Sequence, residues 1–371
     1  MKNRQRIGAC QMAYHYQGII EKYRSRLPLA PEASVISLAE GNTPLIELKH
    51  LSTCLTTPVR LYAKYEGLNP TGSFKDRGMT VAISHAKSRG CQAVICASTG
   101  NTSAAAAAYA ARAAMVAFVL VPAGNIALGK LAQARMHGAQ VIQIQGNFDE
   151  GLRLVREVAQ RVPIEIVNSI NPMRLAGQKT AAFEIVEALG QAPDYHFLPV
   201  GNAGNISAYW MGYQEYYHDR LCAKRPRMVG YQAAGSAPFV LGQAIAHPQT
   251  VATAIRIGDP QSWDKAVQAQ SESGGWFDSV TDDEILAAQR LLAGQEGIFC
   301  EPASAASVAG LLQADQQGQL QPHSVIVCTL TGHGLKDPEI ALSNASHMPL
   351  HHIDDLTALE QLICQTIEPL S

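Results

Sequence analysis

Short apolar runs alternate with longer amphipathic stretches over most of the chain. Runs of this kind, bounded by glycine, proline or asparagine, predict strands, and the stretches between them have the spacing of helices. The predicted strands are 61–65, 93–97, 116–121, 141–144, 164–167, 195–200, 228–233 and 325–328. Strands that alternate with helices form parallel sheets with right-handed crossovers. The pattern therefore predicts an α/β fold.

The length and composition of the chain allow two domains that share a cleft. Of its 371 residues, 47% are apolar and 16% are charged, a balance typical of a globular protein with a large core. We expect two doubly wound three-layer α/β/α domains with mostly parallel sheets, over residues 1–165 and 166–371. The first 65 or so residues are also compatible with packing on the second domain. Residues from about 177 to 190 predict a helix, and residues 238–296 predict mostly helix and loop.

Polar loops that contain glycine follow several of the predicted strands. Ligands bind at the carboxyl ends of strands in parallel sheets, so these loops should converge on one site. Ser98-Thr99-Gly100-Asn101-Thr102 has four hydrogen-bonding side chains, more than a helix cap needs, and suits a carboxylate or a phosphate. Gly201-Asn202-Ala203-Gly204-Asn205 can wrap a single phosphate with backbone N–H groups, although a tight turn explains it equally well.

Two further groups of polar residues lie just after predicted strands. Asn168, Ser169 and Arg174 follow the strand at 164–167, and an arginine there can bind an anion with two hydrogen bonds. Arg174 considered alone is equally compatible with a surface ion pair. Thr331 belongs to a hydroxyl-rich loop after the last strand, and by itself this loop predicts only a turn.

Lys75 lies where a loop is predicted to turn into a helix. Ser73 and Asp76 have the spacing of a capping box, which would start the helix at about Ser73. Lys75 would then lie in the first turn, where the helix dipole and burial both lower the pKa of its amine. A partly neutral lysine suits Schiff-base chemistry, and a solvated lysine is the alternative. Gly78 indicates close approach of another backbone or of a cofactor.

Charge, cysteine and histidine patterns argue against several other functions. The net charge of −2 gives no electrostatic footprint for nucleic acid. The most membrane-like run, 103–121, contains Arg112 and is mostly alanine, so it predicts a buried helix and strand, and we expect no membrane association. Eight cysteines without a Cys-x-x-Cys pair predict free thiols in a reducing, cytoplasmic compartment. The histidines form no set of metal ligands, so we expect no metal.

The motif around Lys75, together with the loops, resembles a known family. Gly-Ser-Phe-Lys-Asp-Arg-Gly is similar to the cofactor-binding lysine segment of fold-type II pyridoxal-phosphate enzymes, the tryptophan-synthase-β-like group. Within that group the chain resembles the threonine synthases, because residues 201–205 read Gly-Asn-Ala-Gly-Asn. The related dehydratases usually carry a glycine-dense loop there. The similar stretches are spread over most of the chain, at 40–45, 69–79, 97–103, 168–180, 201–207, 297–304 and 329–338.

The resemblance implies a role for each candidate residue. Lys75 would be catalytic and would carry pyridoxal 5'-phosphate as a Schiff base, Asn101 would hydrogen-bond the pyridine 3-oxygen, and Thr331 would face the pyridine nitrogen. The cofactor phosphate would lie at Gly201, Asn202, Ala203, Gly204 and Asn205. The substrate carboxylate region would lie at Ser98, Thr99 and Thr102. The substrate phosphate would lie at Asn168, Ser169, Arg174 and Asn202.

The resemblance also implies an activity. O-phospho-L-homoserine and water would be converted to L-threonine and phosphate by β,γ-elimination and replacement, the last step of threonine biosynthesis, in a homodimer. The last strand ends in Cys328-Thr329-Leu330-Thr331-Gly332, with no acid before Asp337. We therefore expect a hydroxyl to face the pyridine nitrogen and to leave it largely unprotonated.

Two alternatives stay open from the sequence. One is another enzyme of the same fold, either a threonine or serine dehydratase or a cysteate-synthase-like enzyme. The other is a catalytically silent relative that binds a metabolite. The products of turnover separate the enzymes, because a dehydratase releases 2-oxobutyrate from threonine and the synthase releases phosphate plus threonine.

Overall fold

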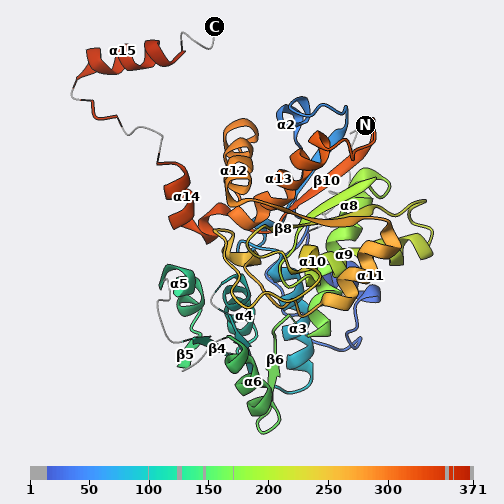
Figure 1. The fold of residues 1–371 in the computed structure, drawn as a ribbon. Helices are drawn as coiled ribbons and strands as arrows, with labels where there is room; N and C mark the ends of the chain where they lie inside the picture. Colours follow the sequence, from blue (N-terminus) through green and yellow to red (C-terminus); the bar gives the residue numbers. More distant parts are fainter. Residues whose placement is uncertain are drawn as a thin grey trace, which may run out of the picture.

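The chain folds around two β-sheets, one of six strands and one of four (Figure 1). The computed structural model describes residues 15–98, 100–122, 128–144, 148–169, 171–346, 351–353 and 355–367. Every strand pair is parallel within these residues except that of β1 with β2. The α/β fold with mostly parallel sheets is thus confirmed.

The six-stranded sheet contains the strands at both ends of the chain. Its order is β1 (Leu45–Glu47), β2 (Arg60–Tyr65), β10 (Val325–Leu330), β7 (Tyr195–Pro199), β8 (Arg227–Ala233) and β9 (Trp276–Val280). One face packs against α2 (Lys49–Thr53), α12 (Asp282–Glu296) and α13 (Pro302–Gln316). The other face packs against α1 (Ile19–Tyr23), α8 (Thr180–Leu189), α9 (Gly204–His218) and α11 (Trp263–Ser273). The first 65 residues therefore supply two strands to a sheet built otherwise from the second half of the chain.

The four-stranded sheet has the order β5 (Gln140–Ile144), β4 (Val116–Pro122), β3 (Ala93–Ala97) and β6 (Ile164–Ile166). α3 (Lys75–Ser88), α4 (Asn101–Arg112) and α5 (Leu128–Met136) cover one face, and α6 (Phe148–Ala159) covers the other. The alanine run 104–108 lies in α4 and is fully buried, because small side chains let this helix pack closely against its neighbours.

Two predicted elements differ in detail from the structure. Residues 238–296, predicted as mostly helix and loop, also contain β9, a short strand at the edge of its sheet with Asp278 and Ser279 in it. The helix predicted from about 177 to 190 is divided into α7 (Pro172–Gln178) and α8, which meet at Lys179. Local sequence gives a weak signal in both places because β9 is short and partly polar, and because α7 begins upstream at Pro172.

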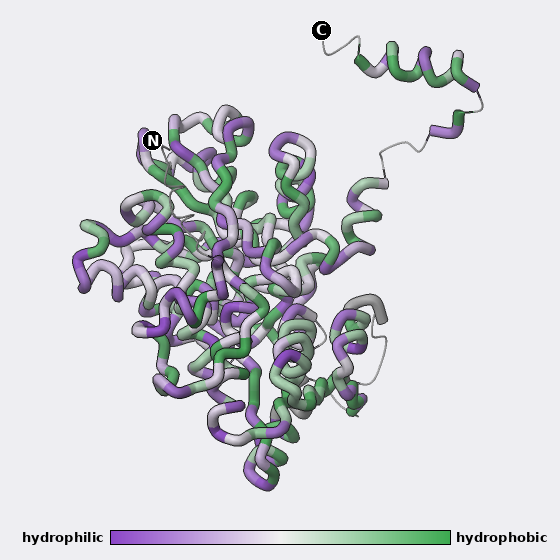
Figure 2. The backbone as a smooth tube through the Cα atoms, turned by 180° about the vertical axis from the view of Figure 1, so that it is seen from behind, coloured by the Kyte–Doolittle hydropathy of each residue, from purple (hydrophilic) through white to green (hydrophobic). Residues whose placement is uncertain are grey.

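The C-terminal part ends in two helices, α14 (Pro338–Asn344) and α15 (Leu356–Ile367). α15 lies apart from the rest of the chain in Figure 1, and its backbone tube in Figure 2 has both green (hydrophobic) and purple (hydrophilic) residues. Leu356, Leu359, Ile363 and Ile367 are exposed on it. No helix among the described residues is long and apolar enough to cross a membrane.

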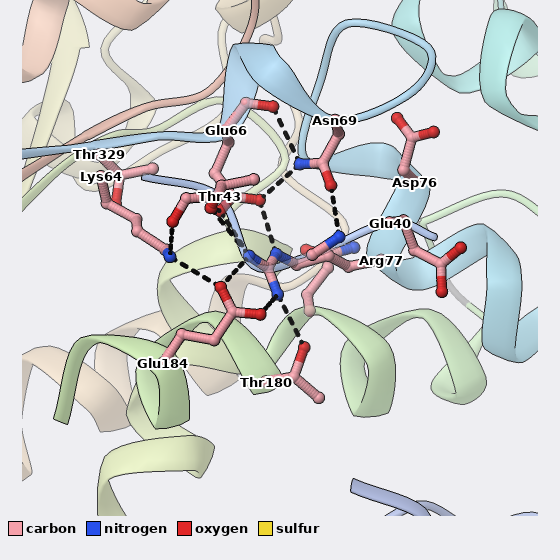
Figure 3. Close-up of polar contacts among 12 residues, drawn as sticks. Glu40, Thr43, Lys64, Glu66, Asn69, Asp76, Arg77, Thr180, Glu184 and Thr329 are labelled. Atoms are coloured by element: carbon pink, nitrogen blue, oxygen red, sulfur yellow. Dashed lines mark hydrogen bonds and ion pairs between the residues drawn. The ribbon is translucent and has the colours of Figure 1, made fainter. Parts of the chain in front are cut away.

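A buried network of charges fixes the helix that carries Lys75 (Figure 3). Arg77 of α3 binds Glu66 through Nε and Nη2, at 2.7 and 2.8 Å, and Glu184 of α8 through Nη1 and Nη2, at 2.8 and 2.7 Å. Lys64 of β2 donates to the same Glu184 at 2.7 Å. Burial alone would raise the pKa of Glu184, but the two cations hold it well below its usual range. The network therefore ties α3 to the six-stranded sheet.

Candidate functional site

Lys75 lies in the first turn of α3, as predicted, but the helix begins at Lys75 itself instead of about Ser73, and it has no capping box. The Asp76 carboxylate accepts hydrogen bonds from the backbone N–H and the hydroxyl of Thr71, at 3.0 and 2.7 Å. Ser73 forms a β-bridge with Gly332 instead of capping the helix. The prediction of a Ser73–Asp76 capping box is wrong because the preceding loop folds back, so that Thr71 of this loop binds the Asp76 carboxylate. The loop and the first helical turn are thereby fixed to each other.

The Lys75 amine lies in an environment that favours its neutral form. Its Nζ lies 4.0 Å from the centre of the Phe74 ring. Burial, and then the positive charge of Arg174, lower the pKa of Lys75 to about 7, and Glu301 acts in the opposite direction. A substantial share of the amine is therefore neutral near neutral pH, which is the state that can attack a carbonyl or accept a proton.

Gly78 marks close contact between two helices. A Cβ atom at Gly78 would lie 3.0 Å from the backbone oxygen of Arg174, and one at Gly177 would lie 1.9 Å from the backbone oxygen of Arg77. The two glycines let α3 and α7 cross with their backbones in contact. The glycine at position 78 is therefore explained by the close approach of another backbone, which is one of the two explanations that the sequence allows. The crossing brings Arg174 close to Lys75.

Arg174 is buried, so the surface ion pair allowed by the sequence is excluded. Only 1% of its surface is exposed. Its Nη1 donates to the Val167 carbonyl at 3.2 Å, while Nε and Nη2 have no hydrogen-bond partner within the described residues. Burial lowers the pKa of Arg174 to about 10. A buried guanidinium with two unpaired donors is costly unless an anion binds there.

The structure brings Asn168 and the loop after β3 together. The Asn168 side chain accepts from the Ala97 N–H at 3.1 Å and donates to the Ala97 carbonyl at 3.0 Å, so its amide holds two strand ends together. Ser98 Oγ accepts from the Gly100 N–H at 3.3 Å. Thr102 and Ser169 are partly accessible. Thr99 lies outside the described residues.

Residues 201–205 form a turn before α9. Ala203 adopts the left-handed conformation with φ of 61°, and α9 begins at Gly204. Among the described residues, the N–H groups of Asn202, Ala203 and Gly204 have no acceptor. Asn205 is buried and its Oδ1 has no partner there either, while its Nδ2 lies 3.4 Å from Gln178 Oε1. Free N–H groups at the positive end of a helix suit a phosphate.

Glu301 joins the site, although the sequence reasoning assigned it no role. Asn101 Nδ2 donates to its two carboxylate oxygens at 3.0 and 3.2 Å, and Thr331 Oγ1 lies 3.4 Å from Oε1. Thr331 Oγ1 also lies 2.9 Å from Ser304 Oγ. An acid therefore lies beside Thr331 after all, supplied by the start of α13 instead of the last strand. In the sequence, Glu301-Pro302 predicts only the start of a helix.

Comparison with known proteins decides the family. A family model described as pyridoxal-phosphate dependent enzyme matches residues 36–332. The threonine synthase of Synechocystis sp. is 59% identical over 90% of this chain and 87% of its own length, and that of Mycobacterium leprae is 57% identical over 94% and 96%. The threonine synthase of Methanocaldococcus jannaschii is 48% identical over 92% and 86%.

The chain belongs to the threonine synthase family. It is thus a pyridoxal-phosphate-dependent lyase of threonine biosynthesis, and the predicted family, activity class and cofactor are confirmed. Solved structures support the fold alone. Processed threonine deaminase isoform 2 from Solanum lycopersicum has a TM-score of 0.73 at 20% identity, covering 94% of this chain and 99% of its own. Maize serine racemase has a TM-score of 0.70 at 19% identity, covering 96% and 99%.

The residues of this chain fit the cofactor on structural grounds. The turn at 201–205 has free backbone donors that would suit its phosphate, and Lys75 has a partly neutral amine that would suit its aldehyde. Phe74 N–H donates to the Thr331 carbonyl at 2.9 Å, so the lysine loop lies directly beside the loop predicted to meet the ring nitrogen. The roles of the individual residues stay predictions.

Proposed function

We propose that this chain converts O-phospho-L-homoserine and water into L-threonine and phosphate. The observation that carries the proposal is two separate sets of hydrogen-bond donors that lack acceptors among the described residues: the backbone N–H groups at the start of α9, and Nε and Nη2 of the buried Arg174. They accompany one partly neutral lysine, Lys75. A reaction between a phosphorylated cofactor and a phosphorylated substrate needs two such sites. A dehydratase acting on serine or threonine needs only a site for the cofactor phosphate, because its substrate carries no phosphate.

The first site would hold the cofactor phosphate through residues 201–205, with Asn205 as a side-chain contributor. Asn101 would contact the oxygen of the ring, and Thr331 its nitrogen. When bound, pyridoxal phosphate supplies an electron sink for negative charge at the carbon atoms of the substrate. Lys75 would accept and return protons at Cα and Cβ, because the lowered pKa of about 7 lets its amine act in both directions near neutral pH.

The second site would hold the substrate phosphate. Arg174 has two free donors for it, and Ser169 lies at the neighbouring strand end. Asn202 Oδ1 accepts from the Gln261 N–H at 3.3 Å, which leaves its Nδ2 for an anion. The side chain of Asn168 is engaged with Ala97, so it would act by placing Ser169. Ser98, Thr99 and Thr102 would hold the substrate carboxylate region at the start of α4.

The substrate identity, the cytoplasmic location and the homodimer belong to the same proposal. High identity to threonine synthases over most of the chain supports the substrate. Light scattering of the purified protein measures its mass in solution and tests the dimer directly.

Arg174→Ala tests the second anion site. We expect KM for O-phosphohomoserine to rise strongly, with a total loss of about 2–5 kcal/mol in kcat/KM, because a buried phosphate loses its charged partner. Bound cofactor, measured by visible absorbance, should stay near the level of the unmodified protein. Arg89→Ala is the matched control, because the Arg89 side chain is 61% exposed whereas Arg174 is buried.

Two outcomes would contradict this assignment. Loss of cofactor with unchanged KM would show that the two phosphate sites are assigned the wrong way round. Unchanged kinetics in Arg174→Ala would show that the guanidinium does not meet the substrate.

A further inference from the structure

Glu301 occupies the N-cap position of α13, yet its side chain does not cap that helix. Acidic residues at a helix start normally interact with the free N–H groups of the first turn. Glu301 makes no such bond, and its carboxylate binds Asn101 at the start of α4. The side chain thus leaves its own helix to contact an element that packs on the other sheet.

The surrounding backbone is built to admit this carboxylate. The Glu301 N–H donates to the Gly332 carbonyl at 3.0 Å, which fixes the residue against the loop after β10. A Cβ atom at Gly332 would lie 2.5 Å from the Glu301 carboxyl carbon, so a larger residue there would displace the acid. Only 4% of Glu301 is exposed.

The Asn101 contact joins the two halves of the molecule. Asn101 begins α4, which covers the four-stranded sheet, and Glu301 begins α13, which covers the six-stranded sheet. An asparagine amide has two N–H donors. The Glu301 carboxylate fixes the direction of one N–H group of Asn101, and this fixes the plane of the whole amide.

We propose that Glu301 is a positioning residue of the reaction: its carboxyl group orients the Asn101 amide at the start of α4 and places a negative charge beside Lys75. The inference rests on the proposed cofactor site, in which the second Asn101 donor meets the ring oxygen. Without Glu301 the amide would lose its orientation, and the protonated form of the lysine nitrogen would lose a favourable charge.

The charges that face Glu301 come from two elements. Lys75 approaches from α3, while Lys336 and Asp337 approach from the 3₁₀ turn Gly334–Lys336 and its end. Burial raises the pKa of Glu301, and Asn101 and the two lysines oppose that effect. Lys336 is itself held at 3.1 Å from the Thr71 carbonyl and 2.6 Å from Gln133 Oε1, so it is not free to replace Asn101.

The test compares Glu301→Gln and Glu301→Ala in the cofactor-loaded enzyme. Two readouts besides activity are used: the pH midpoint of the visible absorbance of the lysine-bound cofactor, and the dissociation constant of pyridoxal phosphate. Both variants should move the midpoint to lower pH, by about one unit, because a nearby negative charge is removed. Glutamine still accepts a bond from Asn101, so only alanine should weaken cofactor binding, by about tenfold.

Asp315→Asn is the matched control, because Asp315 is a buried acid near the other end of α13 that binds Thr56 and Thr57. It should lower the melting temperature and leave both readouts unchanged. An unmoved midpoint in Glu301→Gln, or normal cofactor affinity in Glu301→Ala, would overturn the inference. An unmodified protein with no visible cofactor band and no turnover would overturn the proposed function itself, which keeps the two failures distinct.

Discussion

Lys75→Ala is expected to abolish turnover of O-phosphohomoserine and to remove the visible absorbance of the lysine-bound cofactor. Two effects combine: the covalent attachment point is lost, and so is the group that moves protons at Cα and Cβ. Loss of a general base alone lowers rates by about 10²–10⁴-fold, so the combined loss should bring activity to background. Absorbance spectra and phosphate release in parallel measure both effects.

The control for Lys75 is another lysine of the same helix. Lys87 lies in the last turn of α3 and is exposed, so Lys87→Ala should leave absorbance and activity unchanged. The alanine variant at position 75 should remain folded, because Lys75 makes no ion pair in the described part of the chain. A retained visible band with full activity would contradict the assignment of Lys75.

Arg77→Met is expected to cause the largest loss of stability. The substitution removes the cation that neutralises Glu66 and Glu184 in the interior. Of the network drawn in Figure 3, Lys64 is then the remaining cation. Removing one partner of a buried ion pair costs about 3–5 kcal/mol, because the remaining charge is buried without compensation. Chemical denaturation, followed by fluorescence, measures the change in free energy of unfolding.

Arg89→Met is the control for that loss. Arg89 pairs with Glu165 at 3.3 Å, with its own side chain 61% exposed, and exposed pairs contribute about 0–1 kcal/mol. If Arg77→Met unfolds at the same denaturant concentration as Arg89→Met, the network does not stabilise the fold. Activity should fall together with stability at position 77, since the network holds the start of α3.

The fold and most of the candidate loops could be predicted because their signals are local. Apolar runs bounded by turn residues mark strands, and polar loops after such strands meet at one end of a parallel sheet. The loops at 98–102, 168–169 and 201–205 therefore follow β3, β6 and β7 as expected. The lowered pKa of Lys75 was also predictable in direction, from helix position and burial.

The remaining features depend on contacts between distant segments. Glu301 reaches Asn101 across 200 positions of sequence, and nothing near Glu301 indicates that its side chain turns away from its own helix. Asp76 was predicted to meet Ser73, but the fold-back of the loop brings Thr71 to it instead. Asn168 was a candidate ligand-binding residue because it is polar and follows a predicted strand. Only the structure shows that its amide joins two strand ends.

The most direct test of the account is turnover of O-phospho-L-homoserine by the purified, cofactor-loaded protein, with separate detection of phosphate, threonine and 2-oxobutyrate. The proposed conversion, with its two proposed anion sites, predicts equal amounts of phosphate and threonine, with no oxo acid. Release of 2-oxobutyrate without threonine, or the absence of any phosphate release from a protein that shows the cofactor band, would contradict it.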